Sequence, residues 1–177
     1  MSMMRKLFRP GKGAVPQRFI AAFVNATTSY RGDLAVWDTT APTSQGASGV
    51  LEGKTLGAND FFFVTICPAT ASNSYGLIAG VYEGTTIGDT DTVNNFPDDS
   101  LVIVQTWGVH DTVRTADDTV AAGALLIAST TAGACADAAS STLEGGLAGV
   151  ALTVNTTYTR ATVTTANKVT GFVRCDH

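Results

Sequence analysis

Short apolar runs separated by turn-forming residues are the feature of this sequence that most constrains its fold. Each run is five or six residues long, and glycine, proline, asparagine, aspartate or serine residues lie between them. Runs of this length and spacing are typical of the strands of a barrel or sandwich. The predicted strands are residues 19–24, 33–37, 61–66, 77–82, 101–106, 124–128, 147–152, 159–164 and 168–173.

The composition supports an all-β fold. Only 15% of the 177 residues are charged and 27 are threonine, so β-branched residues outnumber the residues that favour solvated helices. Weak helical signals are confined to residues 113–122 and 132–140, where one short turn would fit. Residues 61–66 and 101–104 are almost continuously apolar, which predicts burial on both faces and favours an oligomer.

The basic residues are concentrated at the start of the chain. Pro10 and Pro16 break this segment, so residues 1–18 are predicted to form an extended arm and residues 19–177 a folded body. The body has six bases against fifteen acids, a net charge of −9. Because such a body repels phosphate, the predicted target of the arm is an acidic protein surface and not nucleic acid. The five basic residues of the arm are Arg5, Lys6, Arg9, Lys12 and Arg18.

Neither a membrane span nor a secretory leader is predicted. The apolar run at residues 19–24 is shorter than a signal-peptide core, and no run approaches the roughly 18 apolar residues of a membrane helix. Cys67, Cys135 and Cys175 cannot all pair within one chain, and none has the spacing of a metal site. They are predicted to be buried thiols of a protein made in a reducing cytoplasm.

Two segments of the sequence resemble each other. Residues 32–41 and 123–132 share a glycine, one further residue, four apolar residues, a short polar residue and Thr-Thr-Ala. Each is followed by a second glycine and a strand, at residues 80–83 and 149–152. This pattern is consistent with a repeated hairpin unit and equally with two independent turns of similar chemistry.

The residues needed for catalysis are scarce. His110 is the one plausible general base, no GxSxG turn accompanies it, and its neighbour Asp111 favours a turn residue satisfied by local hydrogen bonds. No phosphate-binding loop or metal-ligand pattern is present in the sequence, so we expect neither enzymatic activity nor a cofactor. Trp37 and Trp107 leave an alternative open, a carbohydrate-binding module, although both are expected to end apolar strands and cap a core.

Several segments resemble the head decoration, or capsid cement, proteins of tailed bacteriophages. They are residues 30–38, 48–57, 104–110, 121–127 and 149–152. The resemblance implies a small β-barrel or tulip-like body, usually trimeric, on the outer surface of a capsid built from a major capsid protein of the HK97 type. It also implies an arm that binds a neighbouring capsid subunit, for which the expected contact residues are Arg5, Lys6, Leu7, Phe8, Arg9, Lys12 and Arg18. A neck or tail subunit of the virion is the other structural role considered.

Overall fold

The computed structural model of the protein is all-β, as the composition predicts. Fourteen strands and no helix occur among the residues that the structure describes. Those residues are 17–24, 29–37, 50–51, 54–55, 63–67, 78–84, 95–96, 101–139, 146–160 and 164–175. Ten of the strands belong to one mixed sheet that closes on itself.

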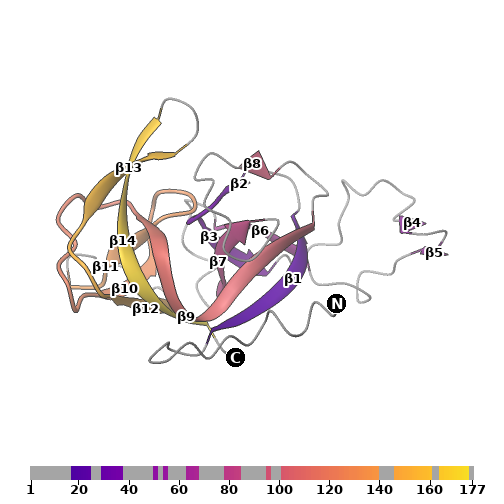
Figure 1. Ribbon diagram of the computed structural model, residues 1–177, viewed down its shortest axis with the longest axis horizontal. Helices are drawn as coiled ribbons and strands as arrows, with labels where there is room; N and C mark the ends of the chain where they lie inside the picture. Colours follow the sequence, from indigo (N-terminus) through magenta and orange to yellow (C-terminus); the bar gives the residue numbers. More distant parts are fainter. Residues whose placement is uncertain are drawn as a thin grey trace.

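One long strand, β9 (Leu101–Thr115), runs through the middle of the molecule (Figure 1). Its first half closes a circuit of five strands that we call the N-terminal unit. The other members are β1 (Arg18–Val24), β3 (Leu34–Trp37), β6 (Phe63–Ile66) and β7 (Ile78–Gly84), paired in the order β1-β6-β3-β7-β9 and back to β1. Only the β1–β6 pairing in this circuit is parallel, so the N-terminal unit is a mixed five-stranded barrel.

The second half of β9 closes another circuit of five strands, the C-terminal unit. Its other members are β10 (Leu125–Ala128), β11 (Cys135–Asp137), β12 (Leu147–Ala151) and β14 (Thr164–Arg174), paired in the order β9-β11-β10-β12-β14 and back to β9. Again only one pairing, β9–β11, is parallel. The strand β13 (Thr156–Arg160) extends this unit as a hairpin with β14. Two short pairs complete the strands: β2 (Ser29–Tyr30) with β8 (Asn95–Phe96), and β4 (Val50–Leu51) with β5 (Lys54–Thr55).

The two units have the same topology and the same register. In chain order, the second and fourth strands of the N-terminal unit are β3 and β7, and those of the C-terminal unit are β10 and β12. In both units the second strand pairs with the fourth. Each pairing has a glycine in its second residue pair and a register shift directly after that pair. The equivalent pairs are Leu34 with Val81 and Ala35 with Gly80 in one unit, and Leu125 with Val150 and Leu126 with Gly149 in the other. The two similar sequence segments therefore occupy equivalent places in two copies of one structural unit.

The glycine that begins each similar segment makes the same turn. Gly32 has a φ of +91° and Gly123 a φ of +89°, a region that side-chain-bearing residues rarely adopt. The N–H of Gly32 donates to the carbonyl oxygen of Tyr82 at 2.9 Å, and that of Gly123 donates to Ala151 at 2.8 Å. These acceptors are themselves register equivalents, so the turn chemistry is duplicated together with the strands.

Equivalent positions also supply the two cores. Ala22, Ala35, Val64, Ala79, Tyr82 and Val102 form the core of the N-terminal unit. Their register equivalents, Val113, Leu126, Cys135, Ala148, Ala151 and Val169, lie in the core of the C-terminal unit. The three cysteines are buried, as predicted, and no disulfide joins them.

The strand predictions succeed for most segments, although one of the predicted strands is longer than expected and one is wrong. Residues 101–106 are only the start of β9, which continues to Thr115 and includes the whole of residues 107–113. Residues 159–164 are not one strand, because β13 ends at Arg160 and β14 begins at Thr164. The helical turn allowed at residues 132–140 is wrong, since Cys135–Asp137 form β11, and Val113–Thr115 of the other candidate turn lie in β9.

Candidate functional site

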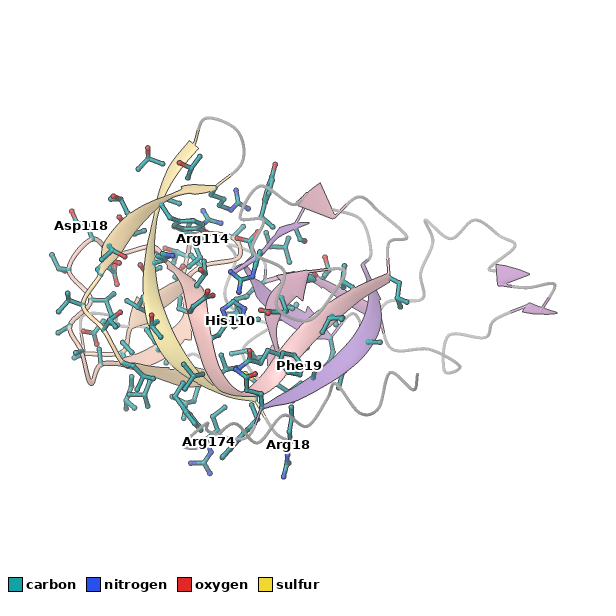
Figure 2. All side chains as sticks on the ribbon, in the orientation of Figure 1. Arg18, Phe19, His110, Arg114, Asp118 and Arg174 are labelled. Atoms are coloured by element: carbon teal, nitrogen blue, oxygen red, sulfur yellow. The ribbon has the colours of Figure 1, made fainter. Side chains whose placement is uncertain are left out.

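A buried ionic cluster lies where the two units meet, and Glu83 is at its centre. The Glu83 carboxylate Oε2 is 2.8 Å from His110 Nε2 and 3.3 Å from Arg31 Nη2. The His110 side chain is fully buried, and those of Arg31 and Glu83 are each only 7% exposed. Figure 2 shows His110 in the middle of the molecule, on β9 between the two units. These three side chains are therefore largely shielded from solvent.

The hydrogen bonds of His110 define its tautomer. The backbone N–H of Thr112 donates to His110 Nδ1 at 3.0 Å, so Nδ1 is the acceptor nitrogen of a neutral ring. The proton then lies on Nε2, which faces the Glu83 carboxylate. The prediction of a turn residue is wrong, because His110 lies inside β9 and is buried. The ring is thus enclosed between the Thr112 backbone and the Glu83 carboxylate, and its side chain is fully buried.

Arg31 extends the cluster to the surface. Its Nη2 also donates to Asp111 Oδ1 at 2.7 Å, and the Asp111 side chain is 67% exposed. Partial burial acts to raise the pKa of Asp111, but the charge and hydrogen bond of Arg31 outweigh it and lower that pKa below its ordinary value. Arg31 Nη1 lies 3.5 Å from Thr112 Oγ1, at the long limit for a hydrogen bond.

A second cluster surrounds the fully buried Asp33. Arg160 binds its carboxylate with two hydrogen bonds, Nε to Oδ1 at 2.9 Å and Nη2 to Oδ2 at 2.6 Å. The N–H of Tyr30 donates to Oδ2 at 3.0 Å, and Arg114 Nη1 lies 3.4 Å from Oδ1. The guanidinium of Arg160 also stacks over the Tyr30 ring at 4.3 Å. The Asp33 carboxylate, in the turn before β3, thus links Arg160 of β13 and Arg114 of β9.

Burial and ion pairing have opposite effects on the pKa values of Asp33 and Arg160. Burial raises the pKa of Asp33, and the contacts with Arg160 and Arg114 oppose that rise. Burial also acts to lower the pKa of Arg160, but its hydrogen bond and ion pair with Asp33 raise it overall. Asp33 therefore depends on Arg160 to stay ionised, and loss of either partner leaves a buried group uncompensated.

The two clusters contain four of the six basic residues of the body: Arg31, Arg114, Arg160 and Lys168. Lys168 Nζ lies 3.3 Å from Thr112 Oγ1 and 5.6 Å from the centre of the Tyr158 ring, which places it beside the first cluster. Three acids, Asp33, Glu83 and Asp111, belong to the clusters too, so two bases and twelve acids of the body lie outside them. The rest of the body therefore carries a net charge of −10, close to the −9 of the whole body, and it stays acidic.

The two tryptophans are both partly buried and are held by different partners. Trp37 ends β3, as predicted, and packs against the core of the N-terminal unit. Trp107 lies in the middle of β9, not at a strand end, and the edge of its ring meets Phe172 with centroids 5.2 Å apart. The guanidinium groups of Arg18 and Arg174 lie 6.0 and 5.8 Å from its centre. This arrangement does not favour the carbohydrate-binding alternative, which needs exposed rings on a common face.

Of the exposed large apolar side chains among the described residues, Leu101 begins β9 and is 52% exposed, and the other four lie on the C-terminal unit. Leu125 is 50% exposed, Leu147 44%, Leu152 46% and Val154 60%. Leu125 lies on β10 and Leu147 on the neighbouring β12, and Leu152 and Val154 follow the end of β12 along the chain. Single exposed leucines are ordinary on a protein surface, but four such residues on adjacent segments indicate a contact surface.

The arm predicted from sequence falls almost wholly outside the described residues. Arg5, Lys6, Leu7, Phe8, Arg9 and Lys12 precede residue 17 and are not placed. Arg18 is the first residue of β1 and not part of an arm, and it points away from the body on the same side as Arg174 (Figure 2). The predicted contact residues of the arm therefore stay a prediction.

Two other kinds of site are absent from the described ranges of residues. Within those ranges, no three His, Cys, Asp or Glu side chains gather as a metal site. None of those residues forms a helix that could cross a membrane. No protein-family model matches the chain, and no curated protein sequence matches it significantly.

Sequence reasoning missed both ionic clusters. Most of their partners lie far apart in the sequence: 52 residues separate Arg31 from Glu83, 80 separate it from Asp111, and 127 separate Asp33 from Arg160. One signal was available: the body has only six bases, and Arg31 and Asp33 flank a glycine directly before an apolar strand. A charged pair at the entrance of a buried strand needs partners from elsewhere in the chain.

Proposed function

We propose that this chain is a structural virion protein, a decoration or cement protein that binds and stabilises the outer surface of a tailed-phage capsid. The observation that best supports this is the distribution of side chains. His110 and most cations of the body are inside, where they hold the two units together, whereas leucines lie on the outside. A protein that works by contact needs such a surface, and it needs no perturbed acid or base.

The expected partner is a major capsid protein of the HK97 type, and the expected assembly is a homotrimer on the outer face of the shell, joined after synthesis in the host cytoplasm. A basic arm suits that role because its charges have no local acidic partner. Residues 1–16 hold four cations and no acid, so their charges are available to an acidic neighbour. Each exposed ion pair contributes only about 0 to 1 kcal/mol, so Leu7 and Phe8 are expected to add apolar contact.

The arm can be tested without disturbing the folded body. Because β1 begins at Arg18, a deletion of residues 1–16 leaves that strand intact. We expect the truncated protein to keep its circular dichroism spectrum and melting temperature but to bind capsids at least about tenfold more weakly. Co-sedimentation with capsids assembled without this chain measures the binding, at several salt concentrations.

A matched variant separates charge from chain length. Replacing the four cations before residue 17 by glutamine keeps the arm and removes only its charge. This variant should lose most of the salt dependence and keep the contacts of Leu7 and Phe8. If truncated and intact proteins bind with the same affinity and the same salt response, the arm has no part in docking. If neither binds capsids at all, the proposed function is wrong.

A further inference from the structure

The two ionic clusters hold one positive charge more than their acids balance. They contain four basic residues and three carboxylates, and each carboxylate is contacted by an arginine. The remaining cation, Lys168, lies with its Nζ 3.3 Å from the neutral hydroxyl of Thr112, and no acidic side chain of the described residues pairs with it. Lys168 is partly buried, and an ammonium group in such a place is stabilised by a counter-ion.

The strand register places a second cation directly beside Lys168. Lys168 on β14 pairs with Arg114 on β9, so the two side chains project from the same face of neighbouring strands. Like charges directly opposite each other destabilise a sheet. Arg114 Nη1 donates to the Ala132 carbonyl oxygen at 2.7 Å and lies 3.4 Å from Asp33, which already binds Arg160 by two shorter hydrogen bonds. The acids of the cluster therefore offset this repulsion only in part.

Two buried hydrogen-bond donors lie in the same region. The Nε of Arg31 and the hydroxyl of Tyr158 are enclosed by protein, and neither has a hydrogen-bond partner among the described residues. Arg31 as a whole is only 6% exposed, and its two carboxylate partners contact Nη2. Buried polar groups are almost always paired, so two unpaired donors in one region indicate a bound group.

Both donors lie close to the excess charge. Lys168 Nζ is 5.6 Å from the centre of the Tyr158 ring. Arg31 Nη1 lies 3.5 Å from the Thr112 hydroxyl that Lys168 also contacts, so two cations share one neutral oxygen. Burial raises the pKa of Tyr158, which keeps its proton at neutral pH and remains a donor. The counter-ion of Lys168 must therefore come from outside these side chains.

We propose that Lys168, Tyr158 and Arg31 bind a small oxyanion of the phosphate or sulfate type. Lys168 Nζ supplies the charge, and the Tyr158 hydroxyl and Arg31 Nε donate hydrogen bonds. An oxyanion with four oxygens can accept from donors on three separate parts of the fold, which a planar carboxylate does less well. The flexible side chain of Lys168 lies over the Tyr158 ring and can turn aside to admit the anion. The bound anion links the β13–β14 hairpin to the turn before β3, and the site is independent of the proposed function.

Thermal unfolding of the full-length protein tests this site, with inorganic phosphate as the probe and sodium chloride at equal ionic strength as the reference. Phosphate at about ten times its dissociation constant should raise the melting temperature by about 3–6 °C more than chloride does. Isothermal titration then measures the dissociation constant. Lys168→Met should raise it at least about tenfold, and Tyr158→Phe about threefold or more.

The effect of Lys168→Met on stability should depend on the anion. Without phosphate, the variant loses the repulsion between Lys168 and Arg114, so it should melt at or above the temperature of the unaltered protein. With phosphate, the unaltered protein should melt higher than the variant. A lysine with a merely structural role would instead lower the melting temperature in both buffers when it is replaced, and that result would contradict the proposal.

Two controls locate the site. Lys54→Met makes the same substitution on β5, in the β4–β5 pair that Figure 1 shows at the other end of the molecule, and should leave the dissociation constant within about twofold. Deletion of residues 1–16 removes the cations of the arm and should also leave the stabilisation by phosphate intact. If this deletion abolishes the stabilisation, phosphate binds the arm and the proposed site is wrong.

Three further results would overturn the proposal. The first is stabilisation by phosphate that is no greater than that by chloride. The second is a Lys168→Met variant that binds phosphate as tightly as the unaltered chain. The third is equal stabilisation by acetate, which would assign the site to carboxylates. None of these results depends on capsid binding, so the proposed function is tested separately.

Discussion

Gly149→Ala provides the most direct test of the duplicated architecture. Gly149 lies on β12 with a φ of +157°, and a Cβ there would overlap the backbone carbonyl oxygen of Phe172 on β14. That carbonyl is held in place by strand pairing, so it cannot move without separating β12 from β14. Gly80, the equivalent residue of the N-terminal unit, has a φ of +152°, and its Cβ would overlap the carbonyl oxygen of Gln105. The same substitution should therefore damage both units in the same way.

The magnitude follows from two separate costs. Holding alanine in this region of φ costs about 1–3 kcal/mol, and overpacking against a fixed neighbour adds about 1–3 kcal/mol. We expect Gly149→Ala and Gly80→Ala each to lower the free energy of unfolding by about 3–5 kcal/mol. Gly123→Ala is the matched control, because Gly123 has a φ of +89° and no atom lies within 4 Å of its would-be Cβ. It should show only the backbone cost, about 1–2 kcal/mol.

Urea and thermal unfolding, followed by circular dichroism, measure these differences. The two variants should differ by about 1–4 kcal/mol, so at about 2–4 °C per kcal/mol for a chain of this size Gly149→Ala should melt roughly 2–16 °C below Gly123→Ala. Equal stability of the two variants would show that β12 and β14 do not approach each other as described. A severe effect at Gly149 with none at Gly80 would contradict the equivalence of the units.

Three further outcomes are expected. His110→Ala removes one of the two partners of Glu83 and leaves a cavity, so it should lower the free energy of unfolding in urea by about 2–4 kcal/mol. Capsid binding of the folded variant should stay within a few-fold of the unaltered protein. A His110-dependent hydrolysis of glycan or peptide would instead support an enzyme. Arg160→Met should destabilise the protein by about 2–4 kcal/mol, and more at pH 7 than at pH 4. Without Arg160 the folded-state pKa of Asp33 is raised above its unfolded value, so the folded state loses stability as the pH rises from the unfolded towards the folded pKa. A loss of stability that is independent of pH would contradict this. Burial raises the pKa of Cys67 to about 11, so labelling of native protein with a thiol reagent at pH 8 should be at least about a hundredfold slower than in urea, and rapid native labelling would refute the buried position.

The all-β class and most strands could be predicted from local sequence because short β-branched runs between turn residues need little tertiary context. The length of β9 could not. Its second half contains Gly108, His110 and Asp111, which break the apolar pattern, and they remain in a strand because β14 pairs along it and Glu83 contacts His110. For β11, the alanine-rich surroundings of Cys135 favour a helix locally, and pairing with β10 overrides that preference.

The ionic clusters were beyond sequence reasoning for a related reason. Each depends on side chains brought together by closure of a circuit, and circuit closure is a property of strand order that no local pattern contains. The similarity of the two segments could be recognised in the sequence because their turn glycines and strands are local features. The duplication of a whole five-stranded unit could not, because only the strand register shows that Leu34 and Leu125 are equivalent.

The two units differ in the charge of residues at equivalent positions, and this difference indicates a role for the buried ionic residues. Asp33 and Glu83 lie where the units meet, and their equivalents in the C-terminal unit are Ala124 and Leu152. Buried ion pairs contribute little net stability, but they exclude alternative arrangements because a shifted pairing leaves a charge unmatched. The ionic residues can thus fix one orientation of the two units within a chain. The exposed leucines of the C-terminal unit impose no such condition, so the proposed function assigns to them contacts that need shape and apolar surface but no matched charge.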